Sequence, residues 1–369
     1  MPNTILLNNV YRDCKLVPAM MRNGELIYQS FVQKIFSLST STIEYTSAGT
    51  YTFTITANDS WTATAPDWIT LSKSSGFGDA TITATITTTG NTGNVNVTCW
   101  NTTKSISVSP VDYSKKYLTF RVSSAGTINW IQTGSTSKTI QYSKNNGSWT
   151  SITSSTAGTS FNVVAGDVIR FKGSNSQYAS STSRYACFYN STAKFSIEGN
   201  IMSLIYGDNF SGQTSLTAQY TFYMLFRGKS GMGATSAENL VFPATTLTQH
   251  CYRDMFYECF ILTTPPKTLP ATTLQNYCYQ DMFAGCRVLT KSPDLPASTL
   301  VSYCYQGMFR VCPKLSYIKC LATNISASNC TTNFTQQVAA EGTFVKASSM
   351  TSWTTGVNGI PSGWTVQNA

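Results

Sequence analysis

Three consecutive segments near the C-terminus repeat one residue pattern. They read FPATTLTQHCYRDMFYECF, LPATTLQNYCYQDMFAGC and LPASTLVSYCYQGMFRVC, and their Cys-Tyr pairs begin at Cys251, Cys278 and Cys304. The period is therefore 27 and then 26 residues. A unit this small cannot bury its own apolar face, so neighbouring units must stack. The pattern predicts a repeat solenoid over residues 201–346, followed by a C-terminal cap over residues 347–369.

Within one repeat, the apolar residues are spaced as on a helix. The positions i, i+1, i+4, i+5 and i+8 form one helical face, and in the second copy they hold Cys278, Tyr279, Met282, Phe283 and Cys286. The preceding Pro-Ala-Thr-Thr-Leu favours extended or turn geometry. We therefore expect each repeat to be an extended segment, a turn and one short helix.

Upstream of the repeats, apolar and polar residues alternate with the period of two that is typical of strands. YTFTITA (51–57), ATITATITTT (80–89) and NVNVTCW (94–100) show it in a first unit, over residues 38–110. YLTFRVSS, TINWIQT and VIRFKG show it in a second unit, over residues 111–200. The expected fold class is multi-domain and mainly β, with two β-sandwiches preceding the solenoid.

Residues 1–37 match neither sandwich pattern and contain only short apolar stretches. A segment of this size is marginally stable in isolation, so we expect it to dock as an anchor. The apolar run Ile5–Leu7 is shorter than the core of a secretory signal, and no stretch is long enough to span a membrane. These features predict synthesis in a cytoplasm without export by the usual route.

The formal net charge is +9, but the 25 basic residues are spread along the whole chain. A nucleic-acid-binding protein usually concentrates such residues on one face, so no nucleic-acid partner is expected. No Cys-x-x-Cys motif occurs, and most of the eleven cysteines recur with the repeat. We interpret them as small buried packing residues.

Residues for catalysis are scarce. His250 is the one histidine, which disfavours a histidine-rich metal site or a Ser-His-Asp triad. Asp254 and Asp281 share a repeat position, but Gly307 replaces them in the third copy. Nothing else places a carboxylate pair suited to glycoside hydrolysis. The chain is predicted not to be an enzyme and to need no cofactor or metal.

Two rows of aromatic residues recur with the repeat. Tyr252, Tyr279 and Tyr305 lie on the apolar face and are expected in the core. The second row lies one position off that face and is a candidate for glycan contact, because sugar rings stack on aromatic faces; it comprises His250, Tyr277 and Tyr303. Partly buried packing is the alternative interpretation of this second row.

The repeats resemble the BspA-type leucine-rich repeats, in their L-P-A-[TS]-T-L lead and their Y-C-Y-Q-x-M-F-x-x-C core. The first β-unit resembles the BACON domain, an immunoglobulin-like module frequent in Bacteroidetes and their phages. Trp61, Pro66, Trp68 and the Ser75–Gly78 turn carry that match. The second β-unit looks like another immunoglobulin-like sandwich.

Together these features resemble a surface protein of the crAss-like phages. The resemblance implies a head fibre or capsid decoration protein on the virion surface, anchored to the capsid through residues 1–37. It also implies adhesion to host or mucus glycans and a homo-oligomer, which we expect to be a trimer. The alternatives are a tail fibre or receptor-binding protein and a bacterial cell-surface glycan-binding protein.

Overall fold

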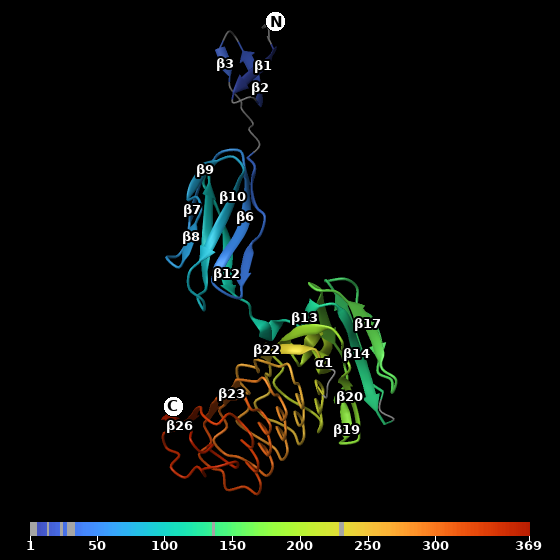
Figure 1. Ribbon diagram of the computed structural model, residues 1–369. Helices are drawn as coiled ribbons and strands as arrows, with labels where there is room; N and C mark the ends of the chain where they lie inside the picture. Colours follow the sequence, from blue (N-terminus) through green and yellow to red (C-terminus); the bar gives the residue numbers. More distant parts are fainter. Residues whose placement is uncertain (1–5, 13–14, 23–24, 28–33, 135–136, 229–231) are drawn as a thin grey trace. The chain divides into compact units, whose positions relative to one another are not determined.

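The computed structural model describes residues 6–12, 15–22, 25–27, 34–134, 137–228 and 232–369 (Figure 1). The chain is mainly β and contains several sheets, as the strand patterns predicted. It divides into two compact units, Met1–Val111 and Asp112–Ala369. No helix of the described residues is long and apolar enough to cross a membrane.

The N-terminal residues contain a small antiparallel sheet. Its strands β1 (Leu6–Arg12), β2 (Lys15–Arg22) and β3 (Glu25–Ile27) pair in the order β1-β2-β3. The remainder of the predicted docking segment, up to residue 33, lies outside the described residues. Residues from Phe36 onward already belong to the next fold, since β4 (Phe36–Leu38) pairs with β6 (Gly49–Ala57).

The first sandwich joins two sheets over one core. The four-stranded sheet has the order β4-β6-β10-β8, and the five-stranded sheet has the order β5-β12-β11-β7-β9. Their inward residues form one cluster that includes Phe53, Ile82, Val95 and Trp61. The further strands are β5 (Thr42–Tyr45), β7 (Ser60–Thr64), β8 (Ile69–Leu71), β9 (Ser75–Phe77), β10 (Ala80–Ile86), β11 (Gly93–Cys99) and β12 (Thr102–Pro110).

The second sandwich opens the C-terminal unit, after the 3-10 turn η1 (Tyr113–Lys115). Its sheets have the orders β16-β15-β18-β13-β21-β22 and β17-β14-β20-β19, and Phe120, Trp130 and Phe188 pack in the core that the two sheets share. The strands before β22 are β13 (Leu118–Ser124), β14 (Gly126–Thr133), β15 (Thr139–Lys144), β16 (Thr150–Thr153), β17 (Thr159–Val163), β18 (Val168–Lys172), β19 (Ala179–Ser181), β20 (Arg184–Phe188) and β21 (Lys194–Asn200).

The second sandwich continues directly into the repeats. Strand β22 (Ala234–Val241) pairs in parallel with β21 and so joins the repeats to the six-stranded sheet. Between these strands lie α1 (Ser203–Tyr206) and η2 (Gly207–Asn209). One hydrophobic cluster runs from Leu118 in the sandwich to Trp364 near the C-terminus. Residues 112–200, 201–346 and 347–369 therefore share one core.

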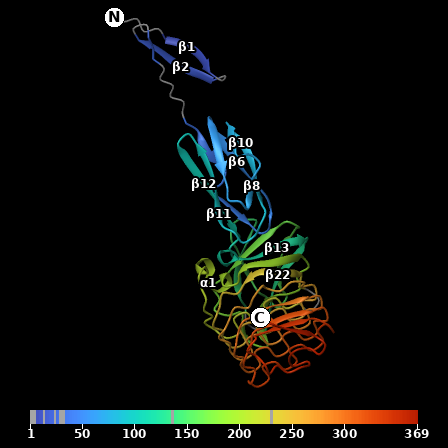
Figure 2. The same ribbon diagram turned by 90° about the vertical axis from the view of Figure 1, so that its left-hand side faces the viewer.

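The repeats stack as rungs, which Figure 2 shows in orange and red. One side of the stack is a parallel sheet of β23 (Lys291–Leu295), β24 (Tyr317–Cys320), β25 (Thr343–Lys346) and β26 (Thr365–Asn368). The other side is built from the Cys-Tyr-x-x-Met-Phe segments. The predicted short helices are wrong, because no helix occurs among the described residues from 242 to 346.

Consecutive tight turns replace the predicted helices. In the first clear copy every fourth residue has a left-handed backbone, with φ of 58° at His250, 55° at Asp254 and 57° at Glu258. The N–H of Met255 donates to Tyr252 O within the rung, at 3.3 Å, while the N–H of Tyr252 donates to Cys278 O of the next rung, at 3.0 Å. Alternate amides thus bond within and between rungs, and this leaves no continuous helix.

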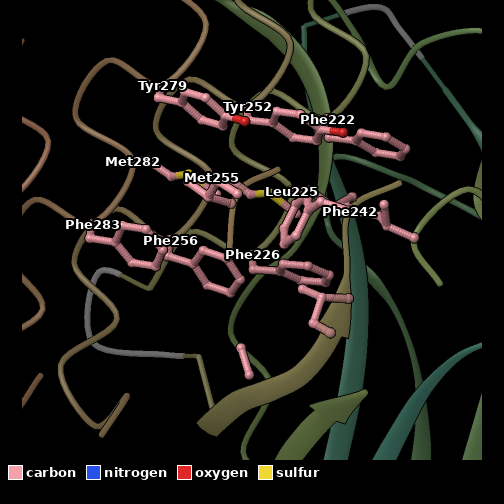
Figure 3. Close-up of a cluster of buried hydrophobic side chains, with 14 of the residues drawn as sticks. Phe222, Leu225, Phe226, Phe242, Tyr252, Met255, Phe256, Tyr279, Met282 and Phe283 are labelled. Atoms are coloured by element: carbon pink, nitrogen blue, oxygen red, sulfur yellow. The ribbon is translucent and has the colours of Figure 1, made fainter. Parts of the chain in front are cut away.

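Each four-residue turn unit sends two side chains inward and two outward. The inward residues form straight rows along the stack, as Figure 3 shows for Phe222, Tyr252 and Tyr279 and for Phe226, Phe256 and Phe283. Aromatic residues at equivalent positions lie 5.3 to 5.7 Å apart in these rows. This stacking explains why the repeats hold the same residue types at the same positions.

The cysteines of the described residues are buried and free. In three successive rungs the closing thiol bonds to a backbone carbonyl of the preceding rung. Cys259 Sγ donates to Phe226 O at 2.9 Å, Cys286 Sγ to Phe256 O at 3.2 Å and Cys312 Sγ to Phe283 O at 3.1 Å. Burial raises the pKa of the Cys259 thiol, so it stays protonated and keeps its role as a donor.

Candidate functional site

The outward side chains of the turn segments form one surface, which we call the turn face. It is built from five rungs, and in each rung the left-handed residue and the residue before the next left-handed one point outward. In the first four rungs its main side chains are Tyr220, Arg227, His250, Arg253, Asp254, Tyr257, Tyr277, Gln280, Asp281, Tyr303, Gln306 and Arg310. Tyr223 has the same register but is only 2% exposed, because it packs against Tyr185 of the second sandwich.

The three sequence-predicted glycan contacts lie together on the turn face. His250 stacks on Tyr277 with ring centres 4.6 Å apart, and Tyr277 stacks on Tyr303 at 4.6 Å. Tyr220 extends the row, 4.4 Å from His250 and nearly parallel to it. All four side chains are half-buried. The rings cover one another's faces, so the inner members present edges rather than faces to a ligand.

The sequence analysis missed Tyr220, which belongs to a degenerate copy of the repeat that precedes the three clear ones. It lies 30 residues before His250, instead of 26 or 27. The available signal was the spacing from the Phe222 and Phe226 pair, which matches that of Tyr252 and Phe256. Counting back two residues from Phe222 gives Tyr220, as counting back two from Tyr252 gives His250.

Arginine and aspartate residues occupy the middle of the turn face. Arg253 Nε lies 3.2 Å from Asp254 Oδ2, and Arg310 Nη2 lies 3.2 Å from Asp281 Oδ1. Burial raises the pKa of Asp254, Arg253 opposes the shift and the nearby Asp281 adds to it, with a net pKa of about 6. Each carboxylate is thus paired with an arginine.

Three buried polar atoms of the turn face lack a hydrogen-bond partner among the described residues. They are His250 Nδ1, Arg227 Nε and Gln280 Oε1. The amide of Gln280 donates to Gln306 Oε1 at 2.6 Å, so only its oxygen is left over. Native folds leave few such atoms, but four others in the described part of the chain lie outside the turn face, at Arg170, Tyr252, Tyr279 and Trp353.

The histidine is held as the neutral base. Burial lowers the pKa of His250 to about 4, from its ordinary value of 6.5, and Arg253 adds to the effect. The unfolded chain takes up a proton below pH 6.5, whereas the folded chain does not until about pH 4. The folded state therefore loses stability as the pH falls through this window.

We expect His250→Tyr to remove this acid sensitivity, because tyrosine fits the row and does not titrate there. At pH 7.5 the variant should match the parent, and at pH 5 it should be more stable by about 1–2 kcal/mol. Asp254 is present in both proteins, so its own titration cancels. Urea unfolding at the two pH values measures the difference, and Tyr303→His should show the reverse trend. An equal pH dependence in parent and His250→Tyr would contradict the assignment.

A cleft lies beside the turn face, where the second sandwich meets the rung that contains His250 and Glu258, which we call the second rung. Its volume is about 500 Å³, and its walls include Asn190, Thr192 and Lys194 from the sandwich and Glu258 and Phe260 from the rung. No group of three or more metal-binding side chains occurs in the described part of the chain.

No protein-family model matches this chain, and no curated protein or solved structure matches it either. Its function is therefore inferred from its motifs and from the geometry of these surfaces.

Proposed function

We propose that this chain is a virion surface protein of a phage, a head fibre or capsid decoration protein that adheres to host or mucus glycans. Its N-terminal residues attach to the capsid, and its sandwiches and rungs form the adhesive part. In this proposal the two sandwiches are immunoglobulin-like modules, the first of the BACON type, and the rungs are BspA-type leucine-rich repeats. The assembled form is a symmetric homo-oligomer, a trimer.

The observation that carries the adhesive role is the turn face. It holds one row of stacked tyrosines and, apart from that row, the arginines Arg227, Arg253 and Arg310. Tyrosine and arginine are enriched at the energetic centres of recognition surfaces. These residues are fixed on a wall whose inward residues are packed and whose backbone is bonded from rung to rung. A surface that is rigid before binding loses little conformational entropy on binding.

A catalytic role is disfavoured by the state of the two best candidates. His250 lies between two tyrosine rings, and its lowered pKa keeps it neutral. Asp254 and Asp281 are each engaged by an arginine. A general acid or base needs access to the proton that it transfers, and these contacts restrict it. We therefore propose a binding protein without enzymatic activity.

Deleting residues 1–33 tests the anchoring role, because the deletion leaves β4 and the first sandwich intact. We expect the shortened protein to fold but to be lost from purified phage particles. Circular dichroism checks the fold, and immunoblotting of particles checks incorporation. Normal incorporation of the deletion variant would contradict an N-terminal anchor.

A further inference from the structure

We propose that the corner cleft binds a saccharide ring of a host or mucus glycan, with Phe260 as its stacking platform. The inference rests on the adhesive role proposed above and gives that role a specific site. The cleft adjoins the turn face, because Glu258, the last left-handed residue of its rung, also lines the cleft. A glycan held in the cleft could continue along the turn face.

The size of the cleft suits a small ligand. Pockets for small molecules have volumes of roughly 300–1,000 Å³, and this cleft, which is shallow and open to solvent, has about 500 Å³. It lies within the C-terminal unit, and its walls come from segments almost 70 residues apart in the sequence, at Asn190 and Glu258.

The walls are held close by glycine residues that leave no room for a side chain. A Cβ on Gly233 would lie 1.6 Å from Ala193 O, and a Cβ on Gly228 would lie 2.0 Å from Glu258 O. The Phe195 N–H donates to Gly233 O at 2.9 Å, which fixes the strand beside the cleft. These close contacts hold the backbone at Gly233 against that of Ala193 and Lys194.

Phe260 supplies the apolar contact that a sugar ring needs. The guanidinium of Arg287, at the same position of the next rung, lies 4.6 Å from the centre of the ring and covers one of its faces. Phe260 also lines the cleft, next to Ile261. In the turn-face row, by contrast, Tyr277 is stacked on both sides. Phe260 is therefore better placed than the predicted row for stacking on a pyranose.

The polar groups of the cleft match a ligand rich in hydroxyls. Asn190 and Thr192 offer an amide and a hydroxyl, and Lys194 and Glu258 offer charges of opposite sign. The Thr192 hydroxyl is positioned by the Thr127 N–H, which donates to it at 2.9 Å. Among the described residues, Lys194 is the one cation that lines the cleft, and a phosphate group is usually bound by a helix N-terminus or a glycine nest as well. The polar wall disfavours a lipid chain. A neutral or amino sugar fits the mixture.

The test applies the full-length protein to an array of printed oligosaccharides, together with Phe260→Ala and a matched control, Tyr317→Ala. Tyr317 is an exposed aromatic residue of the same unit, on strand β24 and outside the cleft. We expect Phe260→Ala to weaken binding about tenfold or more, a loss of about 1.4 kcal/mol, and Tyr317→Ala to leave it unchanged. Lys194→Gln, at an exposed position, serves as the second cleft variant if Phe260→Ala does not fold.

Adhesion of the same proteins to mucin-coated surfaces and to cells of the bacterial host separates the two levels of the proposal. Binding that survives in both cleft variants would overturn the cleft and leave adhesion standing. Adhesion without any retained oligosaccharide would also overturn the cleft alone. A protein that neither adheres nor retains any oligosaccharide would overturn both.

Discussion

Replacing Phe283 with alanine is expected to lower the free energy of unfolding of the C-terminal unit by about 3–5 kcal/mol. Phe283 is fully buried, and its ring stacks between Phe256 at 5.3 Å and Phe309 at 5.9 Å. A cavity in the middle of a row cannot collapse easily, because the backbone bonds between rungs fix their spacing. The removed contacts therefore add to the lost burial.

The same change should destabilise the second sandwich together with the rungs, because one core joins them. Hydrogen exchange followed by mass spectrometry can report on β13 to β21 and on the rungs separately. Thr273→Ala, at an exposed position of the same repeat, is the control and should have little effect. Exchange that rises in the rungs while the sandwich stays protected would contradict a shared core.

The second large effect is expected for Gly233→Ala. The added Cβ would lie 1.6 Å from Ala193 O and 3.2 Å from Lys194 Cα, both of which are backbone atoms. Strand β21 must then move away from the start of β22, where the sandwich joins the repeats. We expect a loss of about 3 kcal/mol, at the upper end of the range for overpacking.

Thermal unfolding of Gly233→Ala against Gly212→Ala measures this effect. Gly212 has a φ of +78° but nothing within 4 Å of its missing Cβ, so its substitution meets backbone strain alone. That strain costs about 1–2 kcal/mol. Equal melting temperatures for the two variants would show that the close approach at Ala193 does not hold the junction.

The strands were predictable from the sequence, because the alternation of apolar and polar residues at a period of two fits a strand and not a helix. The pattern at residues 51–57 became β6, and those at 80–89 and 94–100 became β10 and β11. The core strands of the second sandwich followed equally from alternation.

The turn segments were not predictable from apolar spacing alone. Positions i, i+1, i+4, i+5 and i+8 fit a helix, but they fit a four-residue turn unit equally well over so short a stretch. A partial signal lay at every fourth position, where Asp254, Gly285, Gly307 and Asn333 occur, although Tyr277, Tyr303 and Val311 also have a left-handed backbone. Glycine, aspartate and asparagine are the types that tolerate a left-handed backbone.

Part of the candidate site was also predictable from the sequence, and part was not. The row of His250, Tyr277 and Tyr303 follows from the repeat register, and the structure stacks these residues as neighbours. Their mutual coverage could not be seen in the sequence, since it depends on the distance between rungs. The cleft could not be predicted either, because it needs the contact between residues 190–194 and the second rung.

The central claim, that this chain projects from a phage head and adheres through its C-terminal unit, is tested most directly by imaging labelled particles. Phage particles that carry a gold label at the C-terminus of the chain would be examined by electron microscopy. The proposal predicts label around the capsid, held away from the shell. Label confined to the tail, or particles without label, would contradict it.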